Sequence, residues 1–173
     1  RSGAMAAHSP VIREVVSHSK KGALVLGICN GFQILTESGL LPGVLLRNAS
    51  LKFICRNVHL RVESVNNPFT KGYTKKQTVK IPIAHGDGNY FINKKGIKEI
   101  EDNEQIAFRY CNAEGGINTE SNPNGSLMNI AGILNRNKNV LGMMPHPERV
   151  SDKFTGGSDG EILFQGIVEG LSK

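Results

Sequence analysis

A five-residue segment, G-I-C-N-G at positions 27–31, constrains the fold of this chain more than any other stretch. The apolar run 23–26 precedes it, and residues 32–35, F-Q-I-L, follow it with helical spacing. A buried strand that ends in G-x-C-x-G and turns directly into a helix is the cysteine form of a nucleophile elbow. The segment therefore predicts a reactive thiol at the point where a strand becomes a helix.

The sulfur of Cys29 is the expected reactive group. It would be exposed at the carboxyl end of the strand, where the positive end of the helix dipole favours a thiolate. Glycine is expected at Gly27 and Gly31 because a Cβ in so sharp a turn would collide with neighbouring backbone. The alternative is a buried cysteine that acts as a small hydrophobic residue. The flanking glycines and the switch from strand to helix favour the nucleophile.

The whole chain, residues 1–173, has the size and composition of one soluble globular domain. No apolar stretch approaches the roughly 18 residues that span a bilayer, and residues 1–7 contain too short an apolar run for a secretory signal. The cysteines Cys29, Cys55 and Cys111 form no C-x-x-C pair, which argues against a disulfide framework and a zinc site. A reducing, cytoplasmic location fits a thiol catalyst.

The net charge of +6 at pH 7 raises the question of nucleic-acid binding. Lysines come in pairs at 20–21, 75–76 and 94–95. However, only 6% of the residues are aromatic and tryptophan is absent, so that no stacking platform or recognition helix is expected. We therefore expect solvated loop charges that face an acidic partner surface, and neither nucleic acid nor membrane as a partner.

The order of the expected elements predicts an α/β fold: an open, mostly parallel, twisted sheet of the flavodoxin-like type with helices on both faces. The first element is a helix with Ser9 as N-cap and Pro10 at its first position, ending near Lys20. Because such a sheet needs an earlier strand, we expect a first βα unit, on the order of 30 residues, to be missing, so that the domain is N-terminally incomplete. The later expected elements are strands 58–62, 79–84, 106–111, 130–134 and 140–144, and a closing helix after the capping box Ser158–Glu161.

Two polar segments are expected outside the sheet. Residues 94–104 are charged and typical of surface, and residues 112–126 are rich in Asn, Gly and Ser. Loops as long as the second are usually functional or mobile. The Asn-rich link 135–139 instead predicts a hairpin between its two flanking strands.

A thiol nucleophile needs a base, and the base needs an orienting acceptor. His146 directly follows an apolar strand and lies between two prolines that fix the local backbone. Glu148 is two residues further on, so in an extended segment both side chains point the same way. Glu148 can then hold the imidazole in one tautomer while His146 deprotonates Cys29 and later protonates a leaving nitrogen. The alternative is a stabilising His–Glu pair on the surface.

His85 competes with His146 for the role of base. It also ends an expected strand, the glycines at 86 and 88 leave it space, and Asp87 could orient it. A supporting role that shapes the loop is the preferred hypothesis for His85. His8, His18 and His59 are expected to be surface or packing residues.

Together these motifs resemble the class I (triad) glutamine amidotransferases. G-I-C-N-G-F-Q at 27–33 and P-H-P-E at 145–148 are similar to the motifs of that family. Residues 31–43, 47–53, 82–90 and 122–126 look like the branch formed by the glutaminase subunits of phosphoribosylformylglycinamidine synthase, an enzyme of purine biosynthesis. The resemblance covers nearly the whole chain.

The resemblance implies that Cys29 attacks the side-chain amide of glutamine and that His146 and Glu148 complete a triad. Gln33, one helical turn after Cys29, would contact the bound glutamine. The thioester would be hydrolysed to glutamate, and the ammonia would pass to a partner. The backbone N–H of Asn30 is well placed as one donor to the oxyanion that such chemistry forms.

Two departures from the family's pattern affect what carries over. The glycine-rich loop that gives the second oxyanion donor is absent, and residues 1–4 look like its tail. Without that loop, hydrolysis is expected to fall by about 10²–10³-fold. Asp87 stands where members of the family usually have the longer Glu. The roles of residues in that loop of the family are therefore not transferred to this chain.

The implied partners are a large synthetase subunit and a small accessory subunit of the same complex. The resemblance implies no cofactor in this chain, since ATP and Mg would be used by the synthetase, and no bound metal. Two alternatives stay open: a glutaminase subunit that serves another synthetase, and a non-catalytic partner module.

Overall fold

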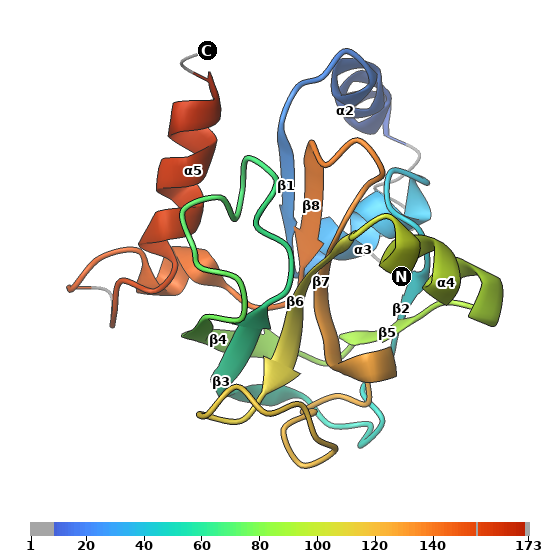
Figure 1. The fold of residues 1–173 in the computed structure, drawn as a ribbon. Coiled ribbons are helices and arrows are strands. Elements are labelled where there is room, and N and C mark those ends of the chain that lie inside the picture. Colours follow the sequence, from blue (N-terminus) through green and yellow to red (C-terminus); the bar gives the residue numbers. More distant parts are fainter. Residues whose placement is uncertain (1–8, 155, 172–173) are drawn as a thin grey trace.

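The computed structural model describes residues 9–154 and 156–171 (Figure 1). The first half of the chain forms α2 (Pro10–Lys20), β1 (Val25–Ile28), α3 (Asn30–Glu37), β2 (Val44–Leu46), β3 (Ile54–Val62), β4 (Thr78–His85) and β5 (Asn89–Phe91). The second half forms α4 (Lys94–Asp102), β6 (Ile106–Cys111), η1 (Leu127–Asn129), β7 (Ile130–Leu134), β8 (Val140–Met143), η2 (Pro147–Val150) and α5 (Glu161–Leu171).

Six strands form one sheet in the order β1-β8-β7-β6-β3-β4. The expectation of a mostly parallel sheet is wrong for the described residues: β1 and β8 are parallel, and the other neighbouring pairs are antiparallel. For β7 and β8 the reason is the short link between them, because a parallel pair needs a long crossover whereas a short link produces a hairpin. The link 135–139 joins β7 to β8 as the predicted hairpin.

Helices cover both faces of this sheet, as predicted, and the fold is α/β. On one face α5 packs its Leu163 and neighbouring apolar residues against β3, β4 and β6 to β8. On the other face Phe32 and Leu35 of α3 and Ile100 of α4 enclose a second core. Figure 1 shows α5 on one side of the sheet and α4 on the other. Among the described residues, no helix is both long and apolar enough to cross a bilayer.

The sheet curls so that its two edge strands meet near the end of β1. The backbone N–H of His146, just after β8, donates to the carbonyl of Pro82 in β4 at 2.8 Å. The Sγ of Cys29, just after β1, lies 3.8 Å from the carbonyl oxygen of Ala84, also in β4. Segments 55 residues apart in the sequence are therefore neighbours at one end of the sheet.

The polar segments are more ordered than expected. Residues 94–102 form the helix α4, capped by the side chain of Asn93, which accepts from the Gly96 N–H at 2.8 Å. Ile97 and Ile100 give this charged helix its narrow apolar side. The small antiparallel sheet of β2 and β5 was not predicted either. The loop 112–126 is held by the side-chain amide of Asn129 in η1, which donates to the carbonyl of Asn118 in the loop and to that of Tyr110 in β6.

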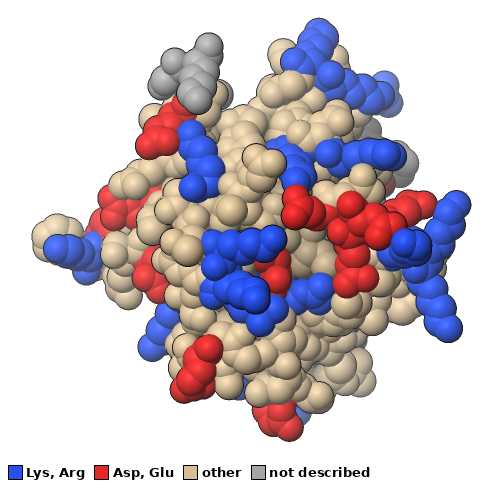
Figure 2. Space-filling model, in the orientation of Figure 1, with Lys and Arg blue, Asp and Glu red and all other residues tan. Residues whose placement is uncertain are grey.

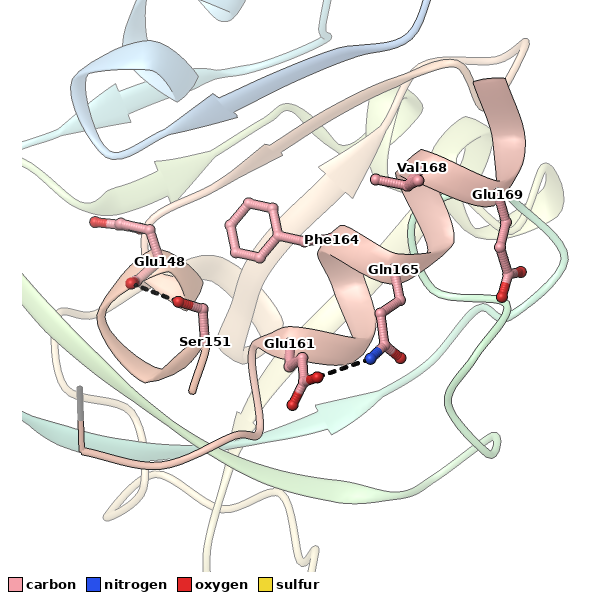
Figure 3. A pocket seen from close by; sticks show the side chains of 7 residues that line it. All are labelled: Glu148, Ser151, Glu161, Phe164, Gln165, Val168 and Glu169. Carbon is pink, nitrogen blue, oxygen red and sulfur yellow. Dashed lines mark hydrogen bonds between the residues drawn. The ribbon is translucent and has the colours of Figure 1, made fainter. Parts of the chain in front are cut away.

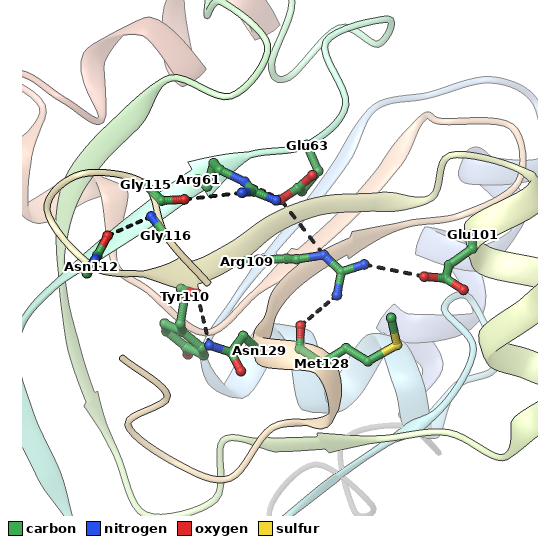
Figure 4. Close-up of polar contacts among 10 residues, drawn as sticks. All are labelled: Arg61, Glu63, Glu101, Arg109, Tyr110, Asn112, Gly115, Gly116, Met128 and Asn129. Carbon is green, nitrogen blue, oxygen red and sulfur yellow. Dashed lines mark hydrogen bonds and ion pairs between the residues drawn. The ribbon is translucent and has the colours of Figure 1, made fainter. Parts of the chain in front are cut away.

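Much of the positive charge is paired with acidic groups. Arg61 donates to Glu63 at 2.8 Å and to the carbonyl of Gly115 at 3.1 Å (Figure 4). Arg109 donates to the carbonyl of Met128 at 2.6 Å and lies 3.6 Å from a carboxylate oxygen of Glu101 in α4. On the face drawn in Figure 2, acidic side chains lie among the basic ones.

The predicted first helix is confirmed as α2: the Ser9 side chain accepts from the Ile12 N–H, and Pro10 is its first residue. Residues 1–4, expected to be the tail of a glycine-rich loop, and His8 lie outside the described residues.

Candidate active site at the nucleophile elbow

Cys29 has the backbone of a nucleophile elbow. It is the N-cap of α3 and directly follows β1, with φ 52° and ψ −105°. A positive φ in a residue other than glycine stores strain, on the order of 1–3 kcal/mol, which the surroundings must hold. They do so through backbone hydrogen bonds: the Cys29 N–H donates to the Met143 carbonyl at 2.9 Å, and its own carbonyl accepts from the Gln33 N–H at 3.2 Å.

The two glycines of the elbow have different roles. A Cβ on Gly27 would lie 2.8 Å from the carbonyl group of Gly31 and would also collide with the side chain of Leu35. The expectation that glycine is required is therefore confirmed at Gly27. At Gly31 it is wrong, because a Cβ there would meet no atom within 4 Å. The crowding arises where α3 packs back on β1; the backbone of Gly31 lies in that contact, but its Cβ position points away from it.

The thiol of Cys29 is partly buried, and burial raises its pKa above the usual range. The N–H of Asn30, which points at the sulfur, lowers the pKa, and so does the positive charge of Arg149, whereas Glu148 raises it. Burial dominates, so that the helix N-terminus alone does not make a resting thiolate. The arrangement instead calls for a base that removes the proton during the reaction.

His146 is held as such a base would be. It follows β8 and starts the 3-10 turn η2, and its backbone N–H is fixed to β4 through Pro82. Its Nδ1 lies 2.6 Å from Oε1 of Glu148. Because a carboxylate only accepts, Nδ1 carries the proton and Nε2 is left with its lone pair. The Nε2 atom is buried and, among the described atoms, has no hydrogen-bond partner.

Glu148 connects the site to a groove on the surface. Its side chain is about half exposed, at 44%, and lies 3.7 Å from the guanidinium of Arg149. It lines a groove of about 570 Å³ whose other wall is α5. Figure 3 shows Phe164 and Val168 of α5 on that wall, where they form the apolar part of the groove. Glu148 therefore faces both the imidazole of His146 and solvent.

The side chain of Gln33 is already hydrogen-bonded within the protein in this structure. Its side-chain Nε2 donates to the backbone carbonyl of Asp87 at 3.0 Å and so ties α3 to the loop after β4. The Asp87 carboxylate does not orient His85, as had been considered, but lies 3.9 Å from Nε of Arg47.

The partner of His85 is Asn48, which the sequence analysis did not identify. His85 Nδ1 lies 3.1 Å from the Asn48 Oδ1. The ring is buried, and burial together with nearby His146 lowers its pKa to about 4. A base that is already unable to hold a proton at neutral pH is poorly suited to carry one between reactants. His85 is therefore close to the site without being held as a base.

Asn48 and Asn124 link the loops around the site, and both are fully buried. The side chain of Asn124 donates to the Gly88 carbonyl at 2.8 Å, and the backbone carbonyl of Asn124 accepts from the Ala49 N–H at 3.0 Å. In the sequence both are single asparagines in loops of an Asn-rich chain, and nothing in their own segments shows that the structure buries them. Among the described residues, no cluster of three or more His, Cys, Asp or Glu side chains could hold a metal.

Comparison with known proteins places this chain in a family. The model of the CobB/CobQ-like glutamine amidotransferase domain matches residues 2–158. The PurQ subunit of phosphoribosylformylglycinamidine synthase from Acaryochloris marina is 54% identical over 171 residues, which are 99% of this chain and 73% of that protein. The same subunit from Synechocystis is 56% identical over 164 residues, 95% of this chain and 73% of that protein.

A solved structure agrees with these sequence matches. The structure of PurLQS from Thermotoga maritima contains a chain that is 42% identical, with a TM-score of 0.84, covering 99% of this chain and 73% of that one. The resemblance seen in the motifs at 27–33 and 145–148 is thus confirmed over the whole chain. This chain belongs to the glutamine amidotransferases, in the branch that contains the PurQ subunits of phosphoribosylformylglycinamidine synthase.

Proposed function

We propose that this chain is the glutaminase subunit of phosphoribosylformylglycinamidine synthase in purine biosynthesis. It hydrolyses L-glutamine to glutamate and ammonia and delivers the ammonia to an ATP-dependent synthetase that makes formylglycinamidine ribonucleotide. The observation that carries the proposal is the strained Cys29 at the start of α3, at the same end of the sheet as an imidazole held 2.6 Å from the carboxylate of Glu148. The relatives named PurQ support the choice of synthetase.

In the first half of the reaction, Nε2 of His146 takes the proton of the Cys29 thiol. The thiolate attacks the carboxamide carbon of glutamine, and the carbonyl oxygen becomes an oxyanion that the Asn30 N–H stabilises. The imidazolium then gives its proton to the leaving nitrogen, the C–N bond breaks, and ammonia departs from the thioester. Glu148 keeps His146 in the required tautomer and stabilises its positive charge.

In the second half, His146 takes a proton from water, and the resulting nucleophile attacks the thioester carbon. The C–S bond breaks, glutamate leaves, and the sulfur recovers its proton from the imidazolium. The raised pKa of Cys29 fits this cycle, because the thiol is deprotonated only when the base acts on it.

The partners follow from the names of the relatives. A structure named PurLQS supports assembly with a large synthetase subunit and a small accessory subunit. ATP and Mg are then used by the synthetase, and this chain needs no cofactor of its own. A glutaminase that serves a different synthetase would have the same site, so the acceptor substrate has to be identified directly.

The test uses the native protein in its complex. In the Cys29→Ala variant we expect no glutamine-dependent product, while free ammonium still supports the synthetase reaction. Cys55→Ala, an exposed cysteine on β3, is the matched control and should keep full glutamine-dependent activity. If Cys29→Ala still hydrolyses glutamine, the nucleophile is wrong. If the complex forms no formylglycinamidine ribonucleotide with either nitrogen source, the assignment to this synthetase is wrong.

A further inference from the structure

One ring nitrogen of His85 has no partner although it is buried. The residue is 3% exposed, and among the described atoms none is within hydrogen-bond reach of Nε2. Buried polar atoms in proteins almost always have a partner, so an unpaired one beside a substrate site calls for a ligand. The carbonyl of the preceding residue, Ala84, lies 3.8 Å from the nucleophilic sulfur.

The hydrogen bonds of Asn48 decide which nitrogen of His85 carries the proton. The Asn48 Nδ2 group lies 2.8 Å from the carbonyl of Lys52 and 2.9 Å from the carbonyl of His85, and it donates to both. The other end of the amide must then be the oxygen, which also accepts from the Gly88 N–H at 3.0 Å. An amide oxygen only accepts, so His85 Nδ1 is the donor and Nε2 is an acceptor.

The surroundings keep this ring neutral. The charged and titratable groups near it are His146, which when protonated opposes a second positive charge, and Asp87 in its own loop, which raises the pKa of the ring less than burial and His146 lower it and is paired with Arg47. From β3 the residue opposite His85 is the apolar Ile54. The orienting partner of His85 is a neutral amide, whereas that of His146 is a carboxylate, so only His146 has a counter-charge for its imidazolium.

Gly88 leaves room for the imidazole ring of His85. A Cβ there would lie 2.5 Å from Nδ1 and 2.8 Å from Nε2 of His85, so glycine is needed for the ring to occupy this position. The Gly88 carbonyl is bound in turn by Asn124. The loop is thus built around one fixed orientation of the imidazole.

We propose that Asn48 holds His85 as a neutral acceptor whose Nε2 binds an N–H group of the substrate glutamine. In this role His85 contacts substrate and sets its affinity, while His146 moves the protons. The inference rests on the proposed function, since it takes glutamine as the substrate. Glutamine has N–H groups at two places, the α-ammonium and the carboxamide, and both offer the donor that Nε2 lacks.

The test measures glutamine binding by calorimetry in the native complex with Cys29→Ala as background, so that no turnover occurs. His85→Asn keeps a donor near the Nδ1 position but removes the acceptor, and we expect the Kd to rise about tenfold, as for the loss of one hydrogen bond. His85→Gln keeps an oxygen near the Nε2 position and should stay within about threefold. Equal binding by His85→Asn and the parent, or equal losses in both variants, would overturn the proposal.

Two analogues identify the donor. Glutaramic acid lacks the α-ammonium, and the γ-methyl ester of glutamate lacks the carboxamide N–H. The difference between His85→Asn and the parent should vanish for the analogue that lacks the donor group. A difference that persists with both analogues contradicts the proposal.

The pH dependence of glutamine binding gives a second test. It would not change if His85 had only a structural role. In Asn48→Asp a carboxylate would stabilise the imidazolium of His85, and a protonated Nε2 cannot accept. Glutamine binding by this variant should weaken as the pH falls from 8 to 6, relative to the parent, and a constant ratio would count against the proposal. If the parent itself binds no glutamine, the proposed function fails; if it binds normally and the His85 variants do too, only this inference fails.

Discussion

The buried ring of His85 should make the fold sensitive to mild acid. Its pKa is lowered to about 4 in the folded protein, against an ordinary value of 6.5. As the pH falls below 6.5 the unfolded chain takes up a proton that the folded protein refuses, so stability is lost between about pH 6.5 and pH 4 and is unaffected above about pH 7.5. The full loss is about 3 kcal/mol, of which about 2 kcal/mol has occurred by pH 5.

Urea unfolding at pH 7.5 and at pH 5 measures this loss. His85→Gln does not titrate, so between these two pH values its free energy of unfolding should fall by about 2 kcal/mol less than that of the wild type. His18→Gln, exposed on α2, is the control for losing a histidine elsewhere and should behave like the wild type. Equal losses in the wild type and His85→Gln would refute the claim that His85 is buried as the neutral ring.

Three further predictions concern the elbow and the base. Gly27→Ala should lower the free energy of unfolding, measured by urea titration, by about 1–3 kcal/mol, because the added Cβ collides with Gly31 and Leu35. Gly31→Ala should leave the free energy of unfolding unchanged or raise it. Equal changes in the two variants would contradict the packing described. Glu148→Gln should lower kcat for glutamine by about 10²-fold or more with an unchanged circular dichroism spectrum, and wild-type turnover would exclude its role. Arg149→Gln removes a positive charge that lowers the pKa of Cys29, so the pH midpoint of alkylation by iodoacetamide should rise; an unchanged midpoint would show that this charge does not reach the sulfur.

The features that the sequence predicted correctly are local ones. The elbow follows from a short apolar strand and from Gly27, and the hairpin at 135–139 follows from its Asn-rich link. The contact of His146 with Glu148 was predicted too, but for the wrong reason: residues 147–150 form a 3-10 turn and not the expected extended segment, and this turn also brings the two side chains together. In each case neighbours along the chain determine the geometry, so the pattern alone carries the information.

The features that the sequence did not predict depend on contacts between distant segments of the chain. The antiparallel pairing of β3 with β4 and β6 is decided by which strands meet in the curled sheet, and no single strand shows it. Asn48 and His85 are 37 residues apart, and their hydrogen bond joins two loops. Helix α4 was taken for a charged surface segment because only Ile97 and Ile100 face the core.

The pKa of the Cys29 thiol also depends on tertiary structure. The sequence places Cys29 at a helix N-terminus, which favours a thiolate, but burial in the folded protein has the larger effect and raises its pKa. The requirement for a base is therefore stronger than the sequence alone indicated.

The central claim is that Cys29 is the nucleophile of glutamine hydrolysis, and covalent trapping tests it most directly. The native protein is incubated with 6-diazo-5-oxo-L-norleucine, a glutamine analogue that alkylates the attacking thiol, and the labelled peptide is identified by mass spectrometry. The account predicts one adduct, on Cys29, with loss of glutaminase activity in proportion to labelling and protection by glutamine. An adduct on Cys55 or Cys111, or full labelling of Cys29 with activity retained, would contradict it.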